Sequence, residues 1–261
     1  MARKEVTTAQ PDPEVLREMD AGNTLPAPRG SFTLGQVDGD NSHDSQQLPR
    51  LQIAYGVGKL ATNFRPGDLV LAKENLLVHK GEPLNVIILM VSKYYKEYLT
   101  PDAYKAQMQP RVYTTRAEVL AAGGTTEWGA KDPVTGRSPG PTFNGAMDLK
   151  MMIQKPKDVV CGLFGTPIGG EEYSPAIWSV DKTAYKRIDP VVSNSARFAL
   201  RTRGIYSAIF QICMAIEQVN GNATPVPQIK LLSHLTDEAV AEIKALFQDS
   251  APAAEPAELP A

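Results

Sequence analysis

The chain runs Leu84-Asn85-Val86-Ile87-Ile88-Leu89-Met90-Val91 and, after Ser92, continues as Lys93-Tyr94-Tyr95-Lys96-Glu97-Tyr98. The first half is apolar and β-branched, which is typical of a buried strand. If the strand continues through the second half, Tyr94, Lys96 and Tyr98 share one face and Lys93 and Tyr95 share the other. Flat aromatic rings beside positive charge suit stacking on unpaired bases. The alternative is a strand end whose tyrosines pack at a barrel rim with their hydroxyls in water.

Short apolar segments with turn residues between them occur along most of the chain. Few helices are signalled: a short one at 101–108 after Thr100, one at 116–122 with capping-box spacing from Thr115 to Glu118, and one from Thr236 to Phe247. Residues 123–146 read as a long surface loop. We therefore predict a mainly β domain of barrel or sandwich type with a few short accessory helices. The further strands are expected at 51–55, 68–71, 76–79, 149–153, 159–164, 173–180, 196–203 and 204–219, with a helix as an alternative for the last.

Charge is segregated along the chain. Residues 1–49 carry 4 basic and 8 acidic side chains, residues 50–235 carry 22 and 15, and residues 236–261 carry 1 and 6. We predict a flexible N-terminal arm at 1–49, a basic β-barrel core at 50–235, a C-terminal helix at 236–248 and a disordered tail at 249–261. A basic core between acidic ends permits binding of a polyanion by the core.

Composition narrows the cellular setting. The N-terminal residues lack the apolar run of a secretory signal, and no apolar stretch reaches the roughly 20 residues that span a bilayer. Cys161 and Cys213 are far apart in apolar surroundings, where reduced thiols are the commoner state. We expect a soluble cytoplasmic protein without membrane contact.

Three arginines form a second candidate for polyanion binding. Arg197, Arg201 and Arg203 alternate with apolar or neutral residues, so a strand would place all three guanidinium groups on one side as a phosphate track. The alternative is the solvated face of an amphipathic strand. Trp178 lies in an apolar segment, where a core position is commoner than a stacking platform. Trp128 lies in the glycine-rich loop and needs a partner surface, either in its own domain or in a ligand.

Catalytic and metal signatures are weak throughout. Glu171 and Glu172 are adjacent and would point to opposite faces of a strand, so they cannot act together on one bond. No His or Cys pair has metal-ligand spacing, and the glycines of residues 162–170 lack the Gly-Lys-Ser/Thr ending of a phosphate loop. We expect no enzyme, no catalytic residue, no bound metal and no cofactor. An enzyme whose carboxylates meet only in the fold is the weaker alternative.

Several short motifs together resemble single-stranded DNA-binding proteins encoded by tailed phages. They span about residues 50–230 and comprise Leu51-Gln52-Ile53 with Gly56-Val57-Gly58-Lys59, the turn Pro66-Gly67-Asp68, the passage from Leu84 through Tyr98, and Gly204-Ile205-Tyr206 running on to Asn220-Gly221 and Val226-Pro227. The resemblance implies an elaborated oligonucleotide-binding (OB) barrel with Lys93 to Tyr98 in its groove. It also implies an acidic C-terminal tail that contacts replication proteins. This tail departs from the pattern, because it ends in Glu258-Leu259-Pro260-Ala261 without a terminal aromatic.

The expected function is sequence-tolerant binding of single-stranded DNA in phage replication or recombination, without catalysis. Phosphates would be neutralised by Lys93, Lys96, Arg197, Arg201 and Arg203, and bases would stack on Tyr94, Tyr95, Tyr98 and Trp178. The alternative is a β-rich structural or assembly protein, such as a virion component, in which the same aromatic and basic residues form a protein interface.

Overall fold

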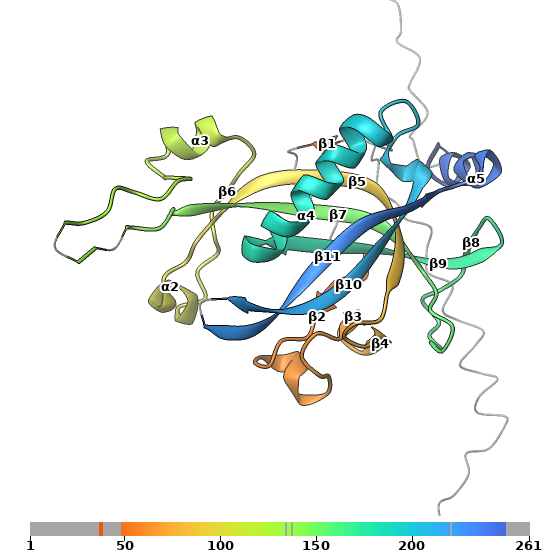
Figure 1. Cartoon of the computed structure of the whole chain (residues 1–261), viewed down its shortest axis with the longest axis horizontal. Helices are drawn as coiled ribbons and strands as arrows, with labels where there is room; N and C mark the ends of the chain where they lie inside the picture. Colours follow the sequence, from red (N-terminus) through yellow and green to blue (C-terminus); the bar gives the residue numbers. More distant parts are fainter. Residues whose placement is uncertain (1–36, 39–47, 134, 137, 220, 249–261) are drawn as a thin grey trace, which may run out of the picture.

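The computed structural model describes residues 37–38, 48–133, 135–136, 138–219 and 221–248 (Figure 1). Most of the N-terminal arm and the whole C-terminal tail expected from the sequence therefore lie outside the described residues. The chain is mainly β, with antiparallel sheets and few short helices, as predicted. Cys161 and Cys213 are free thiols, also as predicted.

The larger sheet has the strand order β11-β10-β5-β7-β9-β8, antiparallel along this path, and the short strands β1 and β6 also pair with β5. A separate three-stranded sheet has the order β2-β3-β4. Both sheets are open. The larger one comprises β1 (Val37–Asp38), β5 (Leu84–Glu97), β6 (Val112–Tyr113), β7 (Phe143–Gln154), β8 (Thr166–Ile168), β9 (Glu171–Asp181), β10 (Ala208–Val219) and β11 (Asn222–His234), and the smaller one β2 (Leu51–Ile53), β3 (Leu69–Leu71) and β4 (Asn75–Val78).

Strand β5 is central, and its apolar half is buried on both faces. Leu84, Val86 and Ile88 belong to the main core, which also contains residues of β2, β3 and β4. Ile87 and Leu89 belong to a second cluster on the opposite face. A continuous apolar run is what burial on both faces requires, so the strongest strand signal of the sequence marks the centre of the sheet.

Four α-helices complete the described fold: α2 (Pro101–Lys105), α3 (Arg116–Ala121), α4 (Lys182–Asn194) and α5 (Asp237–Gln248). The capping box predicted for α3 is formed. Helix α5 packs Ile243 and Phe247 into the second cluster. Helix α4 packs Ile188 and Val192 into the main core and lies across the sheet in front of β5 and β7 (Figure 1).

Some expected elements are wrong. Residues 159–164 form turns and loop rather than a strand, and β7 begins at Phe143, so the long loop is shorter than predicted. Residues 196–203 are not a strand either: Ser195–Ala199 form a π-helical turn that continues α4, and a turn follows. Helix α4 itself was not expected. For residues 204–219, the strand rather than the helix is correct from Ala208 onward.

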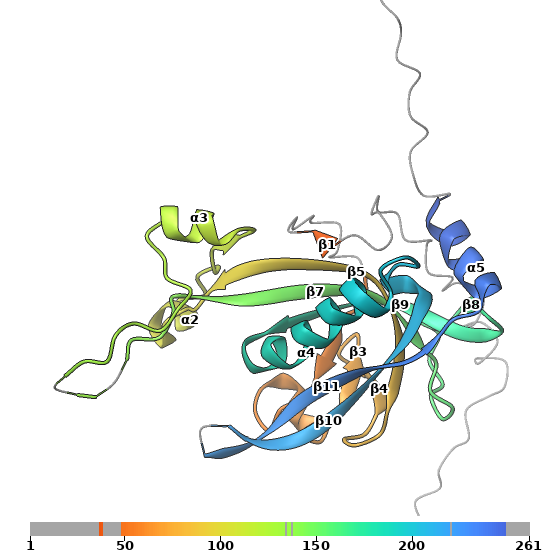
Figure 2. The same cartoon turned by 45° about the horizontal axis from the view of Figure 1, so that its top comes forward.

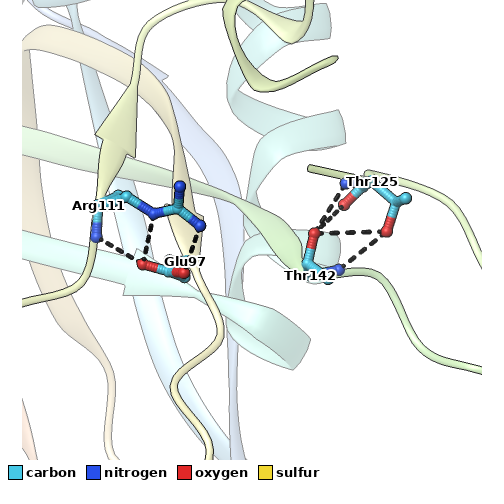
Figure 3. Close-up of polar contacts among 4 residues, drawn as sticks. All are labelled: Glu97, Arg111, Thr125 and Thr142. Atoms are coloured by element: carbon cyan, nitrogen blue, oxygen red, sulfur yellow. Dashed lines mark hydrogen bonds and ion pairs between the residues drawn. The ribbon is translucent and has the colours of Figure 1, made fainter. Parts of the chain in front are cut away.

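The described residues of 98–142, between β5 and β7, form a projecting arm that is distinct from the N-terminal arm. It extends from the body of the molecule beyond the paired ends of these two strands. It carries β6, α2 and α3 (Figures 1 and 2). Its two sides are joined by Thr125 and Thr142, because each threonine backbone N–H donates to the hydroxyl of the other, at 2.7 and 3.1 Å (Figure 3). Trp128, on this arm, is 67% exposed.

Candidate functional site

The basic-aromatic half of β5 keeps the strand alternation predicted for it. In the pairing with β7, Tyr94 lies opposite Ala146 and Lys96 opposite Asn144, whereas Tyr95 lies opposite Gly145 and Lys93 opposite the residue after Ala146. Tyr94 and Lys96 therefore share one face, and Lys93 and Tyr95 share the other. These two faces meet different surroundings.

Lys93 is held by helix α4. Its Nζ lies 2.6 Å from Oδ1 of Asp189 and donates to Oγ of Ser193 at 2.7 Å, and Ser193 Oγ donates to the same Asp189 oxygen at 2.8 Å. The neighbouring Tyr185 hydroxyl has its pKa raised to about 12, chiefly by burial and then by the charge of Asp189 and the proximity of Tyr95. This network fixes α4 on the sheet, and it engages the ammonium group that was expected to contact phosphate.

Two of the expected stacking residues are enclosed. Tyr94 is 9% exposed, and its hydroxyl donates to Oδ1 of Asp148 at 3.1 Å. Burial, followed by the Asp148 carboxylate, raises the pKa of this hydroxyl. Trp178 is 2% exposed, lies opposite Leu149 and belongs to the main core. Neither ring offers a face to a ligand, so the expectation that Tyr94 and Trp178 stack bases is not supported; for Trp178 the core alternative is correct.

A hollow of about 900 Å³ lies where β5 ends and the arm begins. Of the residues nominated from the sequence, Lys96 and Tyr98 line it. Tyr104, Lys105 and Lys182 were not nominated, because Tyr104 and Lys105 lie on the short helix α2 and Lys182 is distant in sequence. The lining consists of Lys96, Glu97, Tyr98, Leu99, Pro101, Tyr104, Lys105, Gln107, Met108, Gln109, Pro110, Asn144, Asp181 and Lys182.

Aromatic rings and lysines come together in this hollow. Tyr98 is 56% exposed and Tyr104 is 76% exposed. Lys182 Nζ lies 5.0 Å from the centroid of the Tyr98 ring, within the range of a cation–π interaction. Lys96 Nζ lies 3.7 Å from a carboxylate oxygen of Asp181, a pair with both side chains about two-fifths exposed.

One ion pair ties the wall of the hollow to β5. The Glu97 carboxylate accepts from Arg111 Nε at 3.1 Å, from Nη2 at 2.7 Å and from the Arg111 backbone N–H at 3.0 Å (Figure 3). These bonds hold the segment after α2 against the strand, and they lower the pKa of Glu97. The carboxylate of Glu97 is thereby matched by a cation of its own.

Two residues of the hollow have unusual backbone conformations. Gln107 has φ +55° and Lys182 has φ +51°, a left-handed region that non-glycine residues seldom adopt. Such conformations persist where the surrounding fold imposes them, and they cluster at ligand sites. At Lys182 this conformation occurs where β9 passes into α4, beside the Tyr98 ring.

The three arginines lie at the far end of α4 from the hollow. Arg197 is on the π-helical turn, and Arg201 and Arg203 follow it in the turn beyond. Arg203 pairs with the Asp237 carboxylate at the start of α5. Arg197 and Arg201 are exposed, with no ion pair to any residue that the structure describes. The structure therefore does not bring the three arginines together with the tyrosines of β5 or of the hollow.

No family model, no curated protein and no solved structure matches the chain in the comparisons with known proteins. Within the described ranges, no group of three or more His, Cys, Asp or Glu side chains is placed to hold a metal ion. Among the helices of that same part of the chain, none has the length and apolar character needed to cross a membrane.

Proposed function

We propose that this protein binds single-stranded nucleic acid, single-stranded DNA foremost, without altering it chemically, and that the hollow at the end of β5 is the binding site. The observation that carries this proposal is the meeting of two exposed tyrosines, Tyr98 and Tyr104, with three lysines in one concavity. Rings of this kind stack bases of any sequence, and each stacked base contributes about 1–3 kcal/mol.

The charges of the hollow support a polyanion as ligand. Three lysines line it against two carboxylates; Glu97 is matched by Arg111, and Asp181 lies 3.7 Å from Lys96. Lys182 lies over one face of the Tyr98 ring, so a base would stack on the opposite face of this exposed ring. Binding of a strand's phosphates releases counterions, so the affinity falls as salt rises.

The fold is compatible with binding of single-stranded nucleic acid. The resemblance to phage single-stranded DNA-binding proteins suggests the biological process in which that binding would act. We take the curved sheet with the small β2-β3-β4 sheet as an opened, elaborated OB barrel. On the same basis we assign the protein to phage replication or recombination in the host cytoplasm, with residues 249–261 as the segment that contacts replication proteins.

A second candidate function is assembly, and the projecting arm favours it. Trp128 and Leu120 on the arm are 67% and 52% exposed, and large exposed apolar side chains are often interface anchors. Under this alternative the chain associates with other copies or with another protein through the arm, and salt has little effect on the association.

A polarisation titration with a labelled oligothymidine at low salt tests the first proposal. The wild-type chain is expected to bind, and Tyr98→Ala and Tyr104→Ala are each expected to raise Kd by about 5- to 150-fold, the loss of one stacked base. Trp128→Ala is the matched control, because it removes an exposed aromatic ring outside the hollow and should leave Kd unchanged. Absence of binding by the wild type, or an equal loss in Trp128→Ala, contradicts the proposal. Salt-insensitive self-association abolished by Trp128→Ala supports the assembly role instead.

A further inference from the structure

The outward face of α4 begins at the hollow. Lys182, Lys186, Pro190 and Asn194 recur at every fourth residue and are all exposed, so they follow one side of the helix. Ile188 and Val192, on the other side, are buried in the main core. Lys182 both lines the hollow and starts this outward face.

Positive charge continues along this face without opposing carboxylates from α4 itself. Asp189, the carboxylate within α4, is turned to Lys93 on β5 and is half-buried. Arg187 is paired with Glu217 of β10. Along the helix and the turn after it, the exposed cations without an ion pair to any described residue are Lys182, Lys186, Arg197 and Arg201.

The far end of the face carries an exposed aromatic ring. Phe198 is 72% exposed and lies in the π-helical turn Ser195–Ala199, next to Arg197 and close in sequence to Arg201. π-helical turns are rare and occur frequently at functional sites. A largely exposed phenylalanine beside two guanidinium groups without ion pairs to described residues repeats the combination of ring and cation found in the hollow.

The hollow and the π-helical turn that carries Phe198 are separated by the length of α4. Helix α4 has 13 residues, which is about 20 Å. In both views it starts on the side of the molecule that carries α2 and ends on the side that carries α5 (Figures 1 and 2). At a rise of about 3.4 Å per nucleotide this distance corresponds to about six nucleotides, and to fewer in an extended strand.

We infer that the bound strand leaves the hollow at Lys182, follows the outward face of α4 and ends at the π-helical turn, where a base stacks on Phe198 and phosphates contact Lys186, Arg197 and Arg201. This inference rests on the proposed function and extends it to a second contact point. It gives Arg197 and Arg201, though not the ion-paired Arg203, the phosphate role expected from the sequence, on a helical turn instead of a strand.

Dependence of affinity on oligonucleotide length tests the inference. Oligothymidines from about 4 to about 16 nucleotides are titrated against the full chain and three variants: Phe198→Leu, the double variant Arg197→Gln/Arg201→Gln, and Arg116→Gln. The last is the matched control, since Arg116 is an exposed arginine on the arm. Phe198→Leu keeps an apolar side chain and removes only the π-face.

For the wild type, the longer oligonucleotides are expected to bind tighter than the shortest. Phe198→Leu should weaken binding of the long ones by about 5-fold or more and leave the shortest unchanged. The double arginine variant should lower the salt slope for long oligonucleotides by about 1.4, which is about 0.7 per lost phosphate contact, and Arg116→Gln should not change it.

The outcomes separate the two proposals. If the wild type binds and the variants keep its gain of affinity with length, the second contact point is overturned while the hollow stands. If Phe198→Leu weakens short and long oligonucleotides equally, the spatial separation of the two points is wrong. If the wild type binds no oligonucleotide, both proposals fail.

Discussion

The centre of the sheet and the outward face of α4 both carry aromatic and basic side chains. These side chains are buried or paired in the sheet and exposed to solvent on the helix. In the sheet, the rings of Tyr94 and Trp178 are enclosed by protein, and the half-buried Lys93 ammonium is bound by Asp189 and Ser193. On the outward face, Lys186, Arg197 and Phe198 are exposed to solvent. The difference follows from position in the fold. Strand β5 has neighbours along both edges and packed layers on both faces, so its polar groups find partners inside the molecule.

The largest effect expected from this difference concerns the two tryptophans. Trp178→Ala should lower the free energy of unfolding by about 3–5 kcal/mol, because it leaves a cavity in the main core. Trp128→Ala, on the exposed arm, should change it by less than about 0.5 kcal/mol. Urea denaturation of both variants measures these changes. An equal loss of unfolding free energy in the two variants would contradict the conclusion that Trp178 is enclosed and Trp128 is exposed.

A smaller effect is expected at Tyr94. Tyr94→Phe removes the hydrogen bond to Asp148 and should cost about 1 kcal/mol at neutral pH, whereas Tyr98→Phe, on the exposed ring, should be neutral. Because the folded state raises the pKa of Tyr94, its hydroxyl stabilises the fold fully below about pH 10, where an unfolded tyrosine is also neutral. Above that pH the unfolded chain ionises first, so the stability difference between wild type and Tyr94→Phe should narrow. Denaturation series at pH 7 and at about pH 11 check the sign, and a widening difference would contradict it.

The smallest and most local effect is expected at the wall of the hollow. Arg111 lowers the pKa of Glu97, so their ion pair is complete above the ordinary glutamate range and is lost as the pH falls through the lowered value. Hydrogen exchange of the Arg111 amide, which donates to Glu97, should therefore accelerate in acid relative to the β5 amides. Arg111→Gln should show the faster exchange already at neutral pH. Unchanged protection in that variant would mean that the backbone pairing alone holds the wall.

The sequence predicted the elements whose signals are local. The apolar run of β5, the capping box of α3 and the proline start of α2 depend on neighbouring residues, and all three are correct. Helix α4 was not predicted from the sequence because Pro190, Val191 and Val192 weaken its helical pattern, and in the structure its N-cap Asp181 makes no side-chain cap bond. Tertiary packing of Ile188 and Val192 stabilises it instead.

The candidate site was predicted in part for the same reason. Lys96 and Tyr98 could be found because they follow the strand signal directly. Tyr104 and Lys182 join them only through the turn of the chain at α2 and the end of β9, which no local pattern reveals. The arginines were identified correctly as exposed cations, but the alternation that suggested a strand is also compatible with a helical turn.

Strand β11 forms one edge of the larger sheet, and its prolines reduce the number of backbone hydrogen-bond donors along it. Pro225 and Pro227 pair with Ile216 and Met214 of β10, and neither carries an amide hydrogen. Proline has no backbone donor and within sheets is found chiefly on edge strands, so β11 offers two backbone donors fewer than a strand without proline. An incoming strand from another polypeptide meets an incomplete hydrogen-bonding template there, which disfavours edge-to-edge aggregation through this long strand.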